Sequence, residues 1–140
     1  LFQNPLQQLV CDRVEDEVAF GPRNYDQGNG DGLEAVLEAA DLTSIRSRRP
    51  QMLSAGQQQR TALAAAMVLA PRLLILDEPT MGQDWGHLSR LMDYLLRLNH
   101  DGQAILLITH DHKLVCRYAG RIVTLRDGRV VTDGRSCGGD

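Results

Sequence analysis

The clearest indication of the fold lies in LSAGQQQRTALAAAMVLAPRLLILDEPT, residues Leu53–Thr80. A serine and a glycine precede residues 56–69, which favour a helix throughout and are followed by a proline that ends it. Residues 73–76, LLIL, are a short continuous apolar run, typical of a parallel strand that is covered on both faces. An Asp-Glu pair, residues 77–78, closes that run. This order of elements predicts an α/β fold.

The residues after this stretch complete a β-α-β unit. Residues 87–100 carry leucines and a methionine at helical spacing, and residues 104–110, AILLITH, have a second buried-strand pattern. The two strands should therefore be parallel neighbours joined by the helix, with a right-handed crossover. Residues 112–119 predict a short helix, and RIVTL-RDG-RVVT, residues 121–132, predicts a hairpin.

The residues before Leu53 are polar and charged, unlike the apolar runs that follow Pro71. Residues 7–20 and 33–45 have helical patterns, separated by a glycine-rich loop. We expect a helical subdomain over residues 1–70, the second half of an α/β core over residues 71–134, and a tail over residues 135–140.

Composition excludes several classes of function. The formal net charge of −3, with 15 Lys and Arg against 18 Asp and Glu, argues against a nucleic-acid surface. The three cysteines form no C-x-x-C pair, which argues against structural zinc. No apolar run approaches the ~18–20 residues of a membrane span, so any membrane role should come through a partner.

The ends of the two predicted parallel strands carry the first candidate site. In such sheets ligands bind beyond the carboxyl ends of the strands, so Asp77, Glu78 and His110 should converge. Asp77 suits a hydrated magnesium ion, Glu78 could accept a proton from water, and His110 could bind a phosphoryl group. Alternatively, the acidic pair merely caps the turn before Pro79. The apolar run before the pair and the Pro-Thr after it favour the chemical role.

The start of the alanine-rich helix carries the second candidate site. Ser54 should cap this helix, and Gly56 lets a backbone N–H approach an anion closely. The helix dipole adds positive charge there, which favours an anion site over an ordinary N-cap. The phosphate-binding loop G-x-x-x-x-G-K-[ST] is absent, because the chain's only lysine, Lys113, has no glycine loop around it.

Several other residues are expected to be structural. His87 and His100 should face solvent at the two ends of their helix. The stripe Leu88, Leu91, Met92 and Leu95 should form core. The charged residues of the first helix should form a solvated face: Arg13, Glu15, Asp16 and Glu17.

Five motifs occur in a familiar order. FQN (residues 2–4), LSAGQ (53–57), LLILDEPT (73–80), MGQD (81–84) and ITHD (108–111) resemble the Q-loop, signature, Walker B, D-loop and H-loop of ABC transporter ATPases. The resemblance implies a partial P-loop NTPase core with an α-helical signature subdomain. It also implies ATP and Mg²⁺ as cofactors, and a head-to-tail dimer in which a second ABC ATPase domain completes each ATP site.

The resemblance assigns a role to each matching position. Gln3 would contact the magnesium ion and the attacking water, Asp77 would be the magnesium carboxylate, and Glu78 the general base. His110 would contact the γ-phosphate, and Asp84 would lie at the dimer interface beside ATP. The signature residues would bind the ATP held by the opposing subunit: Leu53, Ser54, Ala55, Gly56 and Gln57.

The first 24 residues have a narrower likeness. LFQNPLQQLVCDRVEDEVAFGPRN resembles energy-coupling factor (ECF) importers of vitamins, cobalt and nickel, and MGQDW resembles a thiamine-precursor (hydroxymethylpyrimidine) branch. The implied partners are a transmembrane coupling subunit and a substrate-binding membrane component, at the cytoplasmic face of the cell membrane. Replacing Val14 and Val18 by aspartate should then abolish docking.

Two departures from the family stand out. Ala55 replaces the usual second signature glycine and would be strained if that position needs a positive φ. The P-loop and its strand are missing, and the chain starts at Leu1, so we expect a piece of a longer polypeptide that is inactive alone and has unpaired sheet edges. The alternatives are a soluble, non-transport ABC ATPase and a non-catalytic ABC fragment that acts as an interaction module.

Overall fold

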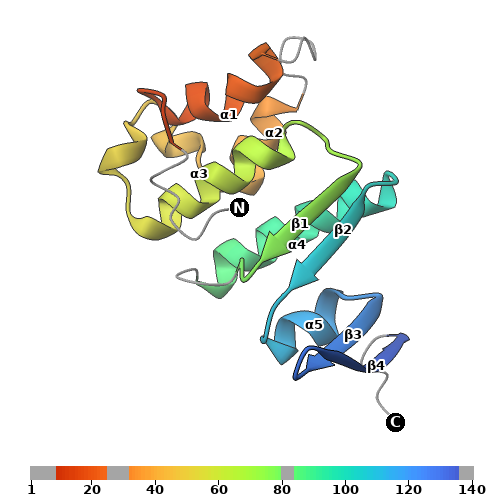
Figure 1. The fold of residues 1–140 in the computed structure, drawn as a ribbon. Helices are drawn as coiled ribbons and strands as arrows, with labels where there is room; N and C mark the ends of the chain where they lie inside the picture. Colours follow the sequence, from red (N-terminus) through yellow and green to blue (C-terminus); the bar gives the residue numbers. More distant parts are fainter. Residues whose placement is uncertain (1–8, 25–31, 80–83, 136–140) are drawn as a thin grey trace. The chain divides into compact units, whose positions relative to one another are not determined.

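The computed structural model describes residues 9–24, 32–79 and 84–135. The chain divides into two compact units, Leu1–Ile108 and Thr109–Asp140, and each is described by itself (Figure 1). Among the residues that the structure describes, the first unit contains α1 (Val14–Asn24), α2 (Leu33–Ala39), the 3₁₀ turns Thr43–Ile45 and Pro50–Met52, α3 (Ala55–Met67), β1 (Leu73–Asp77), α4 (Trp85–His100) and β2 (Ala104–Ile108). The second contains α5 (His112–Tyr118), β3 (Arg121–Arg126) and β4 (Arg129–Arg135).

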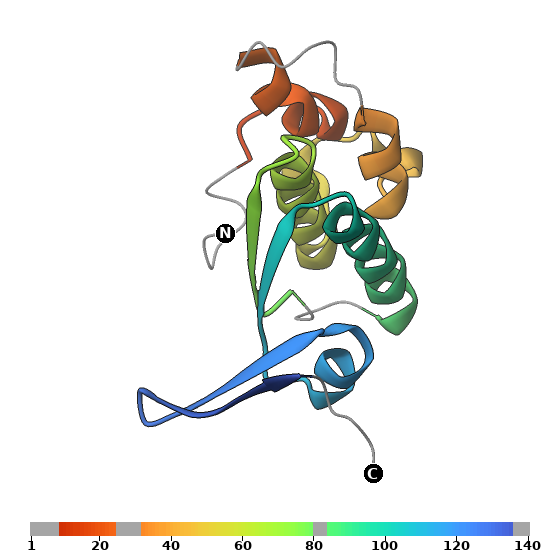
Figure 2. The ribbon, with the colours of Figure 1, turned by 90° about the vertical axis from the view of Figure 1, so that its right-hand side faces the viewer.

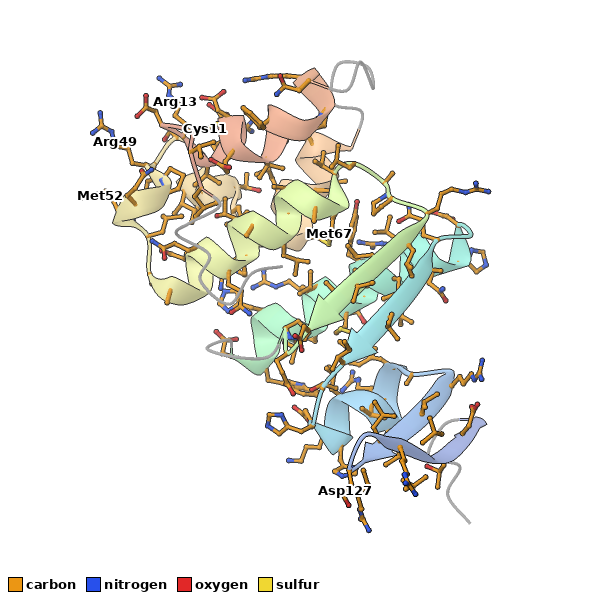
Figure 3. All side chains as sticks on the ribbon, in the orientation of Figure 1. Cys11, Arg13, Arg49, Met52, Met67 and Asp127 are labelled. Carbon is orange, nitrogen blue, oxygen red and sulfur yellow. The ribbon has the colours of Figure 1, made fainter. Side chains whose placement is uncertain are left out.

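Helix α3 forms the centre of the helical part. Its small alanines let α1 pack against it, and Leu63, Ala64 and Met67 are almost fully buried. At Gly21 of α1 an added Cβ would lie 2.7 Å from Leu69 Cδ2, so a larger residue there would require the Leu69 side chain to move. Burial of each such leucine contributes roughly 1.5–3 kcal/mol. Met52, by contrast, is 80% exposed and points away from the helices (Figure 3).

Strands β1 and β2 form the predicted parallel pair. They pair in register from Leu73 opposite Ala104 to Asp77 opposite Ile108. Helix α4 joins them, and α3 and α4 lie on the same side of the pair (Figure 2). The predicted apolar stripe of α4 is buried, as expected: Leu88, Leu91, Met92 and Leu95.

The expectation that β1 is covered on both faces is wrong. Leu74 and Leu76 are buried, but Leu73 and Ile75 are 53% and 48% exposed. Side chains alternate along a strand, and within the first unit the described helices cover only one side of the β1–β2 pair. The uncovered face therefore carries a continuous apolar surface, which we call the open face: Leu73, Ile75, Leu106 and Ile108.

The second unit confirms the predicted hairpin. Strands β3 and β4 pair antiparallel around Asp127 and Gly128, whose φ angles are 50° and 73°. Two positive φ angles define a type I′ turn, the form that matches strand twist, and only glycine adopts them freely. Asp127 marks this turn in Figure 3.

The charged residues of α1 are not a uniformly solvated face. Glu17 is only 5% exposed, and its Oε2 accepts hydrogen bonds from the backbone N–H groups of Val10 (2.8 Å) and Cys11 (2.7 Å). Glu15 pairs with Arg46 Nε at 2.8 Å. A buried carboxylate needs such donors. The pattern of residues 7–20 predicts a helix that starts earlier. The bonds to Glu17 instead hold Val10 and Cys11 outside the helix, and α1 begins only at Val14.

Candidate functional site

The signature segment forms an exposed, well-capped helix start. Ser54 Oγ accepts a hydrogen bond from Gln57 N (3.3 Å), and Gln57 Oε1 accepts one from Ser54 N (3.1 Å). This reciprocal capping box confirms the predicted N-cap. Leu53 is buried and anchors the turn, while Ser54 and Ala55 are exposed. The first N–H groups of a helix have no intrahelical partner, so this end of α3 can donate to an anion.

Alanine in place of the second signature glycine brings no backbone strain. Ala55 is the first residue of α3 and does not have a positive φ. Gly56 follows inside the first turn and is also free of positive φ. Residues with helical φ and ψ favour alanine over glycine. The penalty that would follow from a left-handed residue therefore does not apply here.

Asp77 and Glu78 lie where β1 ends. Asp77 is exposed and opposite Ile108, and Glu78 N donates a hydrogen bond to Ile108 O at 2.8 Å. Glu78 has a φ of 45°, a left-handed conformation that costs a non-glycine residue roughly 1–2 kcal/mol. Non-glycine residues with such a left-handed backbone conformation are frequent at functional sites. The sheet edge thus fixes two adjacent carboxylates at the carboxyl ends of parallel strands.

Asp84 begins α4 as its N-cap. Its Oδ1 accepts a hydrogen bond from His87 N at 3.1 Å, and its Oδ2 contacts His87 Nδ1. The backbone N–H and the ring of His87 hold the pKa of the Asp84 carboxyl below its usual value. Asp84 is therefore an exposed, oriented carboxylate at the start of this helix.

His110 belongs to the second unit. It is exposed and precedes Asp111, which caps α5 by accepting hydrogen bonds from Lys113 N (2.9 Å) and Leu114 N (3.1 Å). Thr109 Oγ1 accepts one from Asp111 N at 3.1 Å. These bonds fix the local backbone around His110. Its convergence with Asp77 and Glu78 stays a prediction.

Some predicted site residues lie outside the described part of the chain. They are Gln3 and the first three D-loop residues, 81–83. Within residues 9–24, 32–79 and 84–135, no three His, Cys, Asp or Glu side chains gather closely enough to hold a metal ion. The exposed carboxylate of Asp77 still fits magnesium, which takes one or two protein carboxylates and keeps several waters.

Comparison with known proteins identifies the family. The ABC transporter family profile matches residues 2–81, more than half of the chain. A putative ABC transporter ATP-binding protein of Methanosarcina mazei is 42% identical over 137 residues, which is 96% of this chain and 23% of that protein. One from Caldanaerobacter subterraneus is 39% identical over 137 residues, 96% of this chain and 24% of that protein. The chain belongs to the ABC transporter family.

Solved structures show the same fold. The cbiO1 protein of Clostridium perfringens, described as part of the ABC transporter complex cbiONQ, matches 96% of this chain and 55% of its own with a TM-score of 0.77 and 31% identity. A dimeric ATP-binding cassette, solved in a post-hydrolysis state with ADP and Pi, matches 98% of this chain and 62% of its own. The TM-score is 0.82 and the identity is 29%. The fold is therefore the α/β ABC ATPase form of the P-loop NTPases. The chain spans about a quarter of the length of its curated relatives.

Sequence reasoning missed one residue of this region. His87 was expected to face solvent, yet its side chain is only 26% exposed and contacts both Asp84 and Asp41. Its place three residues after an N-cap Asp could have indicated the contact with Asp84. Asp41 lies 46 residues earlier, and no local pattern connects it to His87. His100 is 91% exposed, as expected.

Proposed function

We propose that this chain supplies the signature helix and the Walker B carboxylates of an ATP-binding subunit that energises an ECF-type importer of a vitamin or metal ion. The observation that carries the proposal is the pairing of an exposed, capped helix start, Ser54–Gln57, with two carboxylates at the end of β1. The first can bind phosphate and the second can hold a metal ion and accept a proton. The cbiO1 likeness supports the importer type.

The proposed reaction is phosphoryl transfer from ATP to water. Asp77 would hold magnesium, which when bound neutralises charge on the phosphate oxygens. Glu78 orients the attacking water and accepts its proton, and its constrained backbone aims the carboxylate. The N–H groups at the start of α3 bind the γ-phosphate of ATP held by a second ABC ATPase domain. Gln3 and His110 contact the water and the γ-phosphate, and Asp84 contributes at the interface between the two domains.

The P-loop of the complete site comes from another segment in this proposal. The pattern G-x-x-x-x-G-K-[ST] does not occur in the 140 residues, and ATP binding of the family depends on it. The 140 residues alone should therefore not turn over ATP. Over the part of the chain that the structure describes, no helix is both long and apolar enough to cross a bilayer. A place at the cytoplasmic face of the membrane would thus depend on a transmembrane coupling subunit and a substrate-binding component.

Glu78→Gln in the full-length natural protein tests the reaction. The amide keeps the shape of the side chain but cannot accept the proton, so ATP binding should persist while turnover falls by at least about a hundredfold. Single-turnover hydrolysis and equilibrium ATP binding measure the two effects. Glu38→Gln, on the exposed side of α2, is the control and should change neither. Near-normal turnover of Glu78→Gln would remove Glu78 from this role.

A further inference from the structure

A chain of charged hydrogen bonds joins the end of α2 to the first turn of α4. His87 Nδ1 contacts Asp84 Oδ2, and His87 Nε2 lies 2.7 Å from Asp41 Oδ2. Arg90 Nη1 donates to Asp41 Oδ1 at 3.2 Å. All four residues belong to the first unit, so this connection lies within one compact body. We call these residues the His87 cluster: Asp41, Asp84, His87 and Arg90.

The proton count of the cluster follows from its geometry. An ionised carboxylate only accepts hydrogen bonds, and each ring nitrogen of His87 faces a carboxylate oxygen. Both nitrogens must therefore carry hydrogen, which makes the ring an imidazolium. With Arg90, two cations then balance two carboxylates. A neutral ring would aim a lone pair at one carboxylate, and one of the two bonds would be lost.

Both ends of the connection are held by backbone bonds. Asp41 has a φ of 54°, and its N–H donates to Glu38 O at 3.0 Å. Asp84 is fixed as the N-cap by the N–H of His87. The imidazolium thus links two carboxylates whose main chains are already constrained, which lowers the entropy cost of holding the pair.

We propose that His87 is a positioning residue whose imidazolium, braced by Asp41, fixes the carboxylate of Asp84 to the helical part of the chain. The consequence for catalysis rests on the proposed function, in which Asp84 lies where two ATP-binding domains meet. The charged bridge itself does not depend on that function.

The bridge should weaken in acid. The groups that face His87 are Asp41 and Asp84, and Arg90 faces Asp41 from the same helix. The pKa of Asp84 is lowered in the folded chain, so its contribution is present above the unfolded value and is lost as the pH falls through the folded value.

Hydrogen exchange of the full-length natural protein tests the bridge. His87→Gln and Asp41→Asn should each raise amide exchange in the first turn of α4 by roughly twofold to fivefold, the range of partly exposed ion pairs. The double variant should exceed neither single one. Asparagine tolerates the left-handed backbone of residue 41, so Asp41→Asn keeps the fold.

Two further variants sharpen the result. His87→Arg keeps a cation at this position and should preserve the protection of the wild type. His100→Gln, at the exposed end of the same helix, is the control and should change nothing. Additive effects of the Asp41 and His87 changes would overturn the bridge.

ATP turnover separates this inference from the proposed function. With an intact function, kcat of His87→Gln should fall by roughly the twofold to fivefold factor expected for amide exchange, while KM for ATP stays unchanged. An unchanged kcat beside increased exchange would overturn the positioning role. If the wild-type protein shows no ATP turnover, the proposed function fails, while hydrogen exchange still decides whether the bridge exists.

Discussion

At the scale of single residues, Glu17 organises the chain before α1. Its buried carboxylate accepts two backbone N–H groups, those of Val10 and Cys11. Hydrogen bonds to an ionised acceptor are stronger than neutral ones, and a donor that loses its partner keeps its desolvation cost. This single side chain therefore sets where the loop ends and the helix starts.

Removal of the Glu17 carboxylate should destabilise the fold measurably. We expect Glu17→Ala to lower the free energy of unfolding by about 1–3 kcal/mol, because two backbone donors lose their acceptor. Glu17→Gln keeps an acceptor oxygen and should lose less. Urea unfolding of the full-length protein measures the effect, with Glu38→Ala on an exposed position as the control. Equal stability of Glu17→Ala and Glu38→Ala would contradict the assigned role.

Residue-level prediction from the sequence worked where the partner is local. Ser54 and Gln57 are three residues apart, and their capping box follows from that spacing. The predictions for Glu17 and His87 are wrong, because a polar residue on a helix is expected to be exposed and neither side chain is. For His87 the deciding partner, Asp41, is brought near only by tertiary packing. Helical periodicity carries no information about such a partner.

At the scale of elements, α1 and the residues before it are the proposed contact with a transmembrane coupling subunit. Val14 and Val18, which the sequence indicated as the residues to change, are completely buried. Aspartate there would disrupt the packing of α1 and report on folding. Val10 and Phe20 are 70% and 49% exposed and suit a docking test better. Apolar side chains that remain exposed on such a segment can contact a partner.

Aspartate at Val10 and Phe20 should abolish docking without unfolding the protein. We expect co-purification of the full-length protein with a membrane subunit to fall at least about tenfold, because charged groups are depleted at interface cores. Soluble ATP hydrolysis should remain. Met52→Asp, also at an exposed apolar position but outside this segment, is the matched control. Unchanged membrane association of the variant would remove Val10 and Phe20 from the docking surface, and no association of the wild type would favour the soluble ATPase over the importer.

The predictability of the elements has a physical limit. Apolar runs and the Asp-Gly turn were sufficient to place β1, β2 and the β3–β4 hairpin, because strand pattern and turn chemistry are local. The covering of β1 was not predictable from its residues. LLIL is apolar at every position, so its pattern does not say which face lacks a neighbour.

At the scale of the whole molecule, one face of the β1–β2 pair is not covered by the described helices of the first unit. The open face exposes Leu73, Ile75, Leu106 and Ile108 on one side of the parallel pair. Apolar surface of this kind in a soluble fold is a site for further association. The chain also covers only 55–62% of the two solved cassettes. Both observations agree with the proposal that this chain acts as part of a larger ATP-binding unit.

In the proposed head-to-tail dimer, the signature helix and Glu78 of one chain serve two different ATP sites. A mixture of Ser54→Arg and Glu78→Gln full-length proteins tests this arrangement. Each variant alone should be inactive, since every site contains one defect. In a mixed dimer both defects fall in one site and the other site is intact, so turnover should recover to about one quarter of wild type after random exchange. A mixture as inactive as its components, with dimers formed, would show that the signature helix and Glu78 of one chain do not serve separate sites.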